Sequence, residues 1–233
     1  MSSEEQAGRL AAESLAAGDP TGWFERLYAA AEDGEAVVPW ARRAPRPMLV
    51  EWAQARGLDG EGRRALVVGS GLGDDAEYVA GLGFDTVAFD VAASAVRAAQ
   101  RRFPDSKVRY VAADLLDPPV AWREAFDLVV ESLTVQSLPD PPRRAAIARV
   151  ADLVAPGGTL LVIASGREAA HGPVQGPPWP LTRAEIDAFA TGGLRPVRIE
   201  HIPDAGELRW RAEFARPRPG RQPDPLSRAA AAG

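Results

Sequence analysis

The stretch that decides the fold runs from residue 65 to residue 75 and reads ALVVGSGLGDD. A short apolar run at 65–68 leads directly into GSGLG at 69–73, and a helix is expected from about Asp74. Glycines at such a turn let the backbone bend sharply and let a ligand approach without meeting Cβ atoms. The stretch predicts a nucleotide-like ligand across the loop, the alternative being a tight turn that only packs helix on strand.

The same alternation of strand and helix continues along the chain. Short β-rich apolar runs occur at 65–68, 86–89, 108–112, 126–130 and 159–164, and helical stretches lie between them near 75–81, 92–102 and 142–154. Strands separated by helices at this spacing imply βαβ crossovers and a parallel sheet. The nearly continuous apolar character of the runs is typical of strands buried on both faces.

The last third of the chain changes character. Thr182 and Glu185 have the spacing of a capping box, which predicts a helix over 183–190. Two β-like runs follow at 194–201 and 207–215, and a connection this short requires antiparallel pairing. The predicted fold class is therefore α/β, a Rossmann-like seven-stranded sheet, mostly parallel, with a C-terminal antiparallel hairpin and helices on both faces.

Three segments are expected on this basis. Residues 1–60 contain helical stretches separated by prolines and are predicted to form a helical lid or flank. Residues 61–215 form the main domain, in keeping with a chain of 233 residues that supports one full core. Residues 216–233 are rich in proline and poor in large apolar residues, so a disordered tail is expected.

Composition excludes several classes of function. The net charge is −5 and the basic residues are spread along the chain, which disfavours nucleic acid as a partner. The absence of cysteine excludes disulfides and thiolate metal sites, and no metal site is expected. The acidic N-terminus lacks an apolar signal core and no apolar stretch approaches the ~20 residues that span a bilayer, so a cytoplasmic protein without membrane partners is expected. The oligomeric state is left open, a monomer being compatible with the sequence.

The residues after the glycines discriminate between ligands. A nicotinamide dehydrogenase has a third glycine where this chain has Asp74, which Asp75 follows. Two carboxylates would repel a pyrophosphate and would suit a cationic ligand. S-adenosylmethionine, which carries a sulfonium and an α-ammonium, is such a ligand.

Two further aspartates follow the next strands. Asp90 is placed to accept both hydroxyls of an adenosine ribose, the alternative being a helix N-cap. Asp114 is placed to meet the adenine edge with Leu115 packing on the ring, the alternative being a turn aspartate before Pro118.

These motifs together resemble those of a known family. The runs at 65–96, VAADLLD at 111–117, FDLVVESLTVQSLP at 126–139 and VADLVAPGGTLLVIA at 150–164 resemble the successive motifs of class I S-adenosylmethionine-dependent methyltransferases. The resemblance covers about residues 20 to 215 and is greatest to the thiopurine and thiol methyltransferase branch. The features shared with that branch are Val67, Asp75, Trp23, Trp40, PRPMLVEW at 45–52, Leu138-Pro139 and Gly176-Pro177-Pro178. Ala41-Arg42-Arg43 stands where that branch usually has an aspartate after the second tryptophan.

The resemblance implies methyl transfer from S-adenosyl-L-methionine to a small-molecule nucleophile, with S-adenosyl-L-homocysteine as the product. A thiol or related soft atom is the first expectation, with O-, N- or halide methylation as alternatives and a non-catalytic cofactor-binding protein as a further one. The residues expected to bind the cofactor are Gly69, Ser70, Gly71, Gly73, Asp75, Asp90, Val91, Asp114, Leu115 and Glu131.

The acceptor side follows from the sheet, because ligands gather at the carboxyl ends of parallel strands. Glu131 at the end of the fourth strand is expected to bind the cofactor ammonium or to take a proton from the acceptor, the alternative being a solvated loop carboxylate. The residues expected to contact the acceptor are Trp23, Trp40, Gln136, His171 and Trp179, although any one aromatic is more often part of a core.

Overall fold

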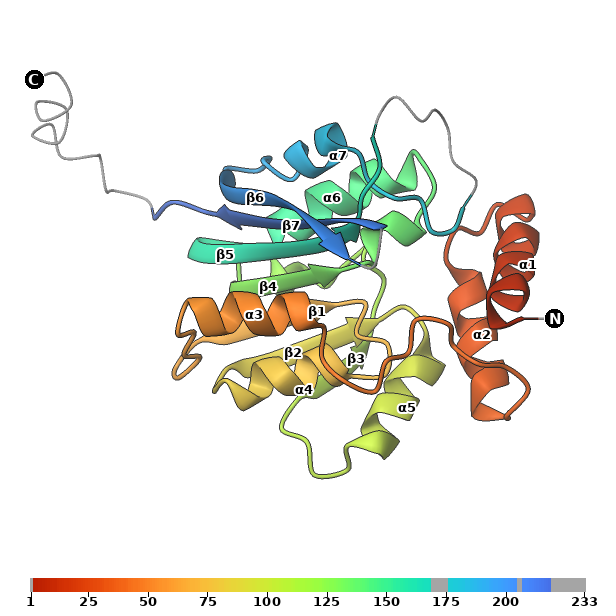
Figure 1. The fold of residues 1–233 in the computed structure, drawn as a ribbon. Coiled ribbons are helices and arrows are strands. Elements are labelled where there is room, and N and C mark those ends of the chain that lie inside the picture. The colour runs from red at the N-terminus through yellow and green to blue at the C-terminus, as the bar shows by residue number, and fades with distance from the viewer. Residues whose placement is uncertain (1, 169–175, 205–206, 219–233) are drawn as a thin grey trace, which may run out of the picture.

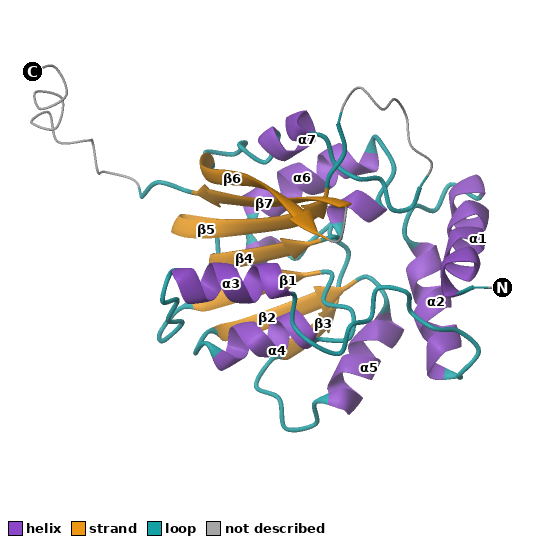
Figure 2. Cartoon of the chain, viewed as in Figure 1, coloured by secondary structure: helices purple, strands orange, loops and turns teal. Residues whose placement is uncertain are grey.

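The computed structural model describes residues 2–168, 176–204 and 207–218 and is built around one seven-stranded sheet (Figures 1 and 2). The strand order is β3-β2-β1-β4-β5-β7-β6. The strands are β1 (Arg64–Val68), β2 (Asp85–Asp90), β3 (Arg109–Ala112), β4 (Phe126–Ser132), β5 (Val154–Ser165), β6 (Arg195–Asp204) and β7 (Glu207–Ala215). Neighbours among β1 to β5 pair in parallel, whereas β7 is antiparallel to both β5 and β6. The predicted fold class is confirmed.

Helices cover both faces of the sheet (Figure 1). They are α1 (Ser3–Ala16), α2 (Gly22–Glu32), α3 (Pro47–Ala55), α4 (Asp74–Gly81), α5 (Ala93–Arg102), α6 (Pro142–Asp152) and α7 (Arg183–Asp187). Alternate residues of a strand point to opposite faces. In β1, Leu66 packs in a core with Ile147 of α6, whereas Val67 packs in a second core with Trp52 of α3. This double burial explains why the parallel strands consist almost entirely of apolar residues.

The N-terminal helices divide into two groups. Although α3 lies within the predicted segment 1–60, its Leu49 and Trp52 are buried against the sheet. Helices α1 and α2 instead form a small core of their own that includes Leu10 and Leu27, and they stand beside the strand ends (Figure 1). Only α1 and α2 therefore occupy the position of a lid or flank. Of the predicted tail, 216–218 are described and the remainder lies outside the described residues.

Carboxylates of α2 attach it to α5. Glu25 accepts hydrogen bonds from Ser94 N at 3.0 Å and Ser94 Oγ at 2.5 Å, at the first turn of α5. Glu32 pairs with Arg97 at 3.3 Å and Arg101 at 2.8 Å. The N-cap of α5 has no side-chain hydrogen bond of its own, so Glu25 supplies the acceptor and the negative charge that a helix N-terminus favours.

The capping box at Thr182 forms as predicted, but α7 is shorter than predicted. Thr182 Oγ1 accepts from Glu185 N, and Glu185 accepts from Thr182 N at 2.8 Å. The helix ends at Asp187 because Phe189 turns into the core, where its ring lies 6.1 Å from that of Phe214.

Candidate functional site

The glycine loop connects β1 to α4 and has two physical requirements for glycine. All three glycines have positive φ, with values of 62°, 51° and 91° at Gly69, Gly71 and Gly73. A Cβ on Gly69 would lie 2.1 Å from Thr134 Oγ1, and one on Gly71 would lie 2.9 Å from Tyr28 Oη. The glycines therefore allow close packing against neighbouring segments as well as the sharp turn.

A cavity of about 620 Å³ lies beside this loop, at the carboxyl ends of the parallel strands. Its size is that of a cofactor or small-molecule site. The predicted residues that line it are Gly69, Ser70, Gly71, Asp75, Asp90, Val91, Asp114, Leu115, Trp23, Trp40 and Gln136. Gly73, Glu131 and Trp179 do not line this cavity, and His171 lies outside the described residues.

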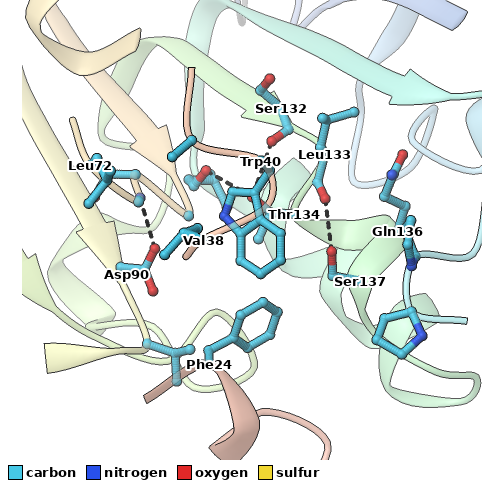
Figure 3. A pocket seen from close by; sticks show the side chains of 18 of the residues that line it. Phe24, Val38, Trp40, Leu72, Asp90, Ser132, Leu133, Thr134, Gln136 and Ser137 are labelled. Carbon is cyan, nitrogen blue, oxygen red and sulfur yellow. Dashed lines mark hydrogen bonds between the residues drawn. The ribbon is translucent and has the colours of Figure 1, made fainter. Parts of the chain in front are cut away.

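Asp90 is the buried carboxylate of the cavity wall. Its Oδ2 accepts from Gly71 N at 2.9 Å and its Oδ1 accepts from Ala92 N at 3.0 Å, so it holds the glycine loop in place (Figure 3). Ala92, not Asp90, is the N-cap of α5. Burial raises the pKa of Asp90 to about 6. Each oxygen retains a lone pair, which suits the acceptance of hydroxyl groups from a sugar.

Asp114 forms the turn considered as the alternative and also lies at the cavity. Its Oδ1 accepts from Leu116 N at 2.8 Å, the bond of an aspartate turn, and the side chain also lines the cavity. The neighbouring Leu115 is buried and contributes apolar wall. Together they offer one carboxylate oxygen and one apolar surface to a flat heterocycle.

The expectation that Asp74 and Asp75 select a cationic ligand requires correction at Asp74. Asp74 forms a bidentate ion pair with Arg102, with both N–O distances at 2.6 Å, so its charge is already balanced. Asp75 Oδ1 accepts from Arg46 N at 2.7 Å, and burial raises the pKa of its carboxyl. Asp75 thus attaches the segment before α3 to the glycine loop and also lines the cavity.

Glu131 lies beneath the wall, not in it. The side chain is 1% exposed, and its Oε1 accepts from Thr134 N at 2.8 Å and Val135 N at 2.9 Å, which fixes the turn after β4. Its Oε2 is buried without a hydrogen-bond partner in the described part of the chain. Burial raises the pKa of Glu131 to about 7. The solvated loop carboxylate considered from sequence is excluded, and a base in direct contact with an acceptor does not fit this placement.

Aromatic rings from the N-terminal segment close one side of the cavity. The rings of Trp23 and Trp40 meet edge to face at 5.8 Å, and those of Phe24 and Trp40 at 6.3 Å. Trp40 Nε1 donates to Tyr28 Oη at 2.9 Å, which ties the loop before α3 to α2. In Figure 3, Phe24 and Trp40 lie between Asp90 and Gln136. Phe24 and Tyr28 were not predicted, although both lie on the same helix as Trp23.

A polar cluster from three segments, namely the turn after β4, the end of β5 and the start of β7, lies on the other side of the sheet centre from Asp114, which follows β3. Gln136 Oε1 accepts from Ser165 N at 2.6 Å, and Gln136 Nε2 donates to Ser165 Oγ at 3.3 Å. Arg209, at the start of β7, also donates to Ser165 Oγ and pairs with Glu207 at 2.7 Å. All four residues line the cavity. Ser165, Glu207 and Arg209 were not predicted; Ser165 ends the parallel strand β5, where its position on the strand could have indicated it, whereas only the antiparallel insertion of β7 brings Glu207 and Arg209 here.

Trp179 has a different role from the predicted one. The guanidinium of Arg143 lies 5.8 Å from the centre of its indole ring, and Trp179 N donates to the backbone oxygen of Gln136 at 2.7 Å. Trp179 thus supports the segment that carries Gln136 and does not face the cavity.

Arg46 was also missed. It lines the cavity, and within the described residues its guanidinium forms neither an ion pair nor a hydrogen bond. Burial lowers its pKa, whereas the nearby carboxylates of Asp75 and Glu131 favour its charged form. The PRP segment at 45–47 indicated only a break in the chain, and no local pattern reveals that its arginine points into the cavity.

Among the described residues, no helix is both long and apolar enough to cross a membrane. No group of three acidic or histidine side chains in the same residues is arranged to hold a metal ion.

Comparisons with known proteins agree with this architecture. Residues 65–158 match the model of a methyltransferase domain family. An uncharacterized methyltransferase of Mycobacterium tuberculosis is 36% identical over 76 residues, which is 33% of this chain and 37% of that protein. The chain therefore spans about a third of the length of this curated relative.

Solved structures share the fold. A structure concerned with the conversion of a disulfide bond into a thioacetal group during echinomycin biosynthesis has a TM-score of 0.66 at 22% identity, over 90% of this chain and 98% of that one. The N-methyltransferase NodS from Bradyrhizobium japonicum, in complex with S-adenosyl-L-homocysteine, has a TM-score of 0.64 at 21% identity, over 83% and 99%. Residues 65–158 thus match a methyltransferase domain family and lie on a Rossmann-like sheet.

Proposed function

We propose that this protein transfers the methyl group of S-adenosyl-L-methionine to a small-molecule nucleophile. The observation that carries the proposal is Asp90, a buried carboxylate that holds the glycine loop and also lines the cavity. A ribose diol donates to such a carboxylate, and the neighbouring wall of Asp114 and Leu115 suits an adenine ring. The complex of the structurally similar NodS with S-adenosyl-L-homocysteine supports this choice of ligand.

The other end of the cofactor has matching partners. Its amino-acid part carries a carboxylate and an ammonium. Arg46, which lines the cavity without an ion pair among the described residues, is suited to bind the carboxylate. Ser70 lines the cavity and its Oγ is buried without a hydrogen-bond partner in that part of the chain, so the ammonium would satisfy this acceptor. We assign Glu131 a positioning role, because its Oε1 fixes the turn at Thr134 and Val135.

When bound, S-adenosyl-L-methionine supplies a methyl group on a positively charged sulfur, which is an activated electrophile. The acceptor atom forms its bond to the methyl carbon while the carbon–sulfur bond breaks and its electron pair stays on sulfur. The contribution of the protein is to align the two reactants and to exclude water. Trp40 and Phe24 form the apolar wall on one side of this path, and Gln136 lies at its end (Figure 3).

A thiol is the acceptor we favour. At the acceptor end, the carboxylate of Glu207 is paired with Arg209, and Glu131 lies beneath the cavity wall. An acceptor that loses its own proton to water near neutral pH suits such a site, and thiols, with a pKa near 8.5, do so more readily than phenols, with a pKa near 10. The resemblance to the thiol methyltransferase branch points the same way. Amines, phenols and halides are the competing acceptors.

The test has two stages. Calorimetric titration with S-adenosyl-L-homocysteine should show micromolar binding, whereas NAD should not bind; no cofactor binding at millimolar concentration would overturn the proposal. A screen of thiols, phenols, amines and halide ions, read out as S-adenosyl-L-homocysteine formed, then identifies the acceptor atom. Cofactor binding without turnover of any acceptor would favour a non-catalytic binding protein.

A further inference from the structure

Positive charge gathers at the acceptor end of the cavity. Arg42, Arg46 and Arg209 all line the cavity, and they come from the loop before α3 and from the start of β7. Arg42 and Arg209 lie close enough to Arg46 to lower its pKa. Three guanidinium groups in one small cavity repel each other, so this end is suited to a negatively charged ligand.

Six carboxylates also line the cavity, Glu4, Asp74, Asp75, Asp90, Asp114 and Glu207, and Asp74 is already paired with Arg102. The carboxylates that act on Arg46 and Arg209 are those of Asp75, Glu131 and Glu207, and they balance only part of the positive charge. Glu207 pairs with Arg209 at 2.7 Å, and burial raises the pKa values of Asp75 and Glu131, which weakens them as counter-charges near neutral pH. Arg42 is exposed at the cavity, and within the described residues its guanidinium has no ion pair or hydrogen bond.

Under the proposed function the cofactor does not remove the excess charge. Its sulfonium and ammonium together outweigh its single carboxylate, so it brings a net charge of about +1 into the cavity. The cofactor carboxylate binds Arg46, so Arg42 and Arg209 remain to contact the methyl acceptor. The acceptor is therefore the component that can bring negative charge.

The remaining wall is apolar and rich in rings. Phe24 and Trp40 present rings 6.3 Å apart at 74° to each other, and Pro177 and Pro178 line the same cavity. Rings and prolines of this kind favour a planar hydrocarbon body over a flexible polar one. Two guanidinium groups remain for the acceptor. That of Arg42 has no ion pair within the described residues, whereas that of Arg209 is already paired with Glu207, so together they suit a ligand with one negative charge.

We propose that the methyl acceptor is an organic monoanion whose apolar body contains a ring and carries one carboxylate. The carboxylate binds between Arg42 and Arg209, while the ring packs on Phe24 and Trp40. This inference rests on the proposed function and deepens it. Arg209 is held in place by Ser165 and Glu207, so it presents a fixed guanidinium, and Arg42 supplies the second one at the entrance.

The test uses the full chain saturated with S-adenosyl-L-homocysteine, so that cofactor binding is established first and its failure is recognised separately. Calorimetry then compares 4-mercaptobenzoate with 4-mercaptobenzamide and 4-hydroxybenzoate with 4-hydroxybenzamide, pairs that differ only in charge at the carboxyl position. We expect each acid to bind at least tenfold more tightly than its amide. Phenyl phosphate, a dianion, is included, and tighter binding of it than of either acid would overturn the assignment to a carboxylate.

Matched variants locate the effect. Arg42→Gln and Arg209→Gln should each lower the ratio of acid to amide affinity at least fivefold. Arg43→Gln removes the same charge from the same loop, but Arg43 does not line the cavity, so the ratio should stay at the wild-type value. Equal binding of acid and amide, no binding of either acid below millimolar concentration, or an equal effect of Arg43→Gln would each overturn the proposal.

Discussion

The two ends of the cavity are built in different ways. At the end proposed to bind adenosine, called the adenosine end below, Gly71, Asp90 and Asp114 lie at the ends of three neighbouring strands within about 45 residues, and each carboxylate is fixed by backbone N–H groups. At the acceptor end, Trp40, Ser165 and Arg209 come from segments far apart in the chain and are fixed mainly by other side chains. A site fixed by hydrogen bonds to nearby backbone groups can be recognised from local sequence patterns. A site fixed by contacts between side chains depends on how distant segments of the chain pack together.

The first prediction concerns the backbone of the glycine loop at Gly69, where a side chain should disrupt the adenosine end. In Gly69→Ala, the new Cβ lies 2.1 Å from Thr134 Oγ1, and alanine must also adopt a φ of 62°, so both the loop and the turn after β4 must move. We expect at least 100-fold weaker binding of S-adenosyl-L-homocysteine by calorimetry and a lower Tm. Gly81→Ala is the control, since its Cβ would meet nothing within 4 Å and stability should rise by up to about 1 kcal/mol. Unchanged affinity in Gly69→Ala would contradict the account of the loop.

The second prediction removes the carboxylate that links loop and ribose. In Asp90→Asn, one side-chain oxygen becomes an NH₂ group that faces Gly71 N or Ala92 N, both of which are hydrogen-bond donors. The variant also weakens the proposed contact with the ribose. Cofactor affinity should therefore fall about 10- to 100-fold. In the wild type, protonation of Asp90 below its pKa of about 6 should weaken cofactor binding by up to about tenfold per pH unit as pH falls. Titrations from pH 5 to pH 8 measure this slope; a flat wild-type profile would speak against ribose binding by Asp90.

The third prediction separates the two ends chemically. Arg46→Gln should weaken binding of S-adenosyl-L-homocysteine about tenfold through loss of one charge-assisted contact. It should leave binding of methylthioadenosine, which lacks the amino-acid part, within twofold of the wild-type value. Calorimetry with both ligands measures the difference, and Arg43→Gln is the matched charge control. Equal losses for the two ligands would show that Arg46 does not bind the carboxylate.

The fourth prediction concerns Glu131, whose side chain fixes the turn after β4, and it involves the smallest expected change in cofactor affinity. Because the folded-state pKa of Glu131 is raised to about 7, the folded form favours the protonated carboxyl. Its contribution to the free energy of unfolding is therefore largest below pH 4.5 and falls by up to about 3 kcal/mol as pH rises to 7. Glu131→Gln should lack this decline while cofactor affinity changes less than tenfold. Urea unfolding at pH 5 and pH 7.5 tests it; parallel losses in variant and wild type would refute it.

The sequence was sufficient for the sheet and for the placement of Asp90 and Asp114 at the cavity, because both follow from local patterns. Apolar strand runs, the capping box at Thr182 and carboxylates after strands all appear where expected. The charge argument at Asp74 failed because its partner, Arg102, lies on another helix 28 residues away. Trp179 and Arg46 show the same limit at the acceptor end, since only packing decides which of them faces the cavity.

The direction of β7 has a consequence for redesign. An antiparallel strand beside β5 brings its first residues, not its last, to the edge of the sheet that carries the cavity, and Arg209 pairs in register with Ser165. Glu207 and Arg209 therefore line the cavity, while Leu208 and the inward residues Trp210, Ala212 and Phe214 pack on the core. Under the proposed function, exchange of Glu207 and Arg209 alters acceptor choice and leaves the glycine loop and the core in place.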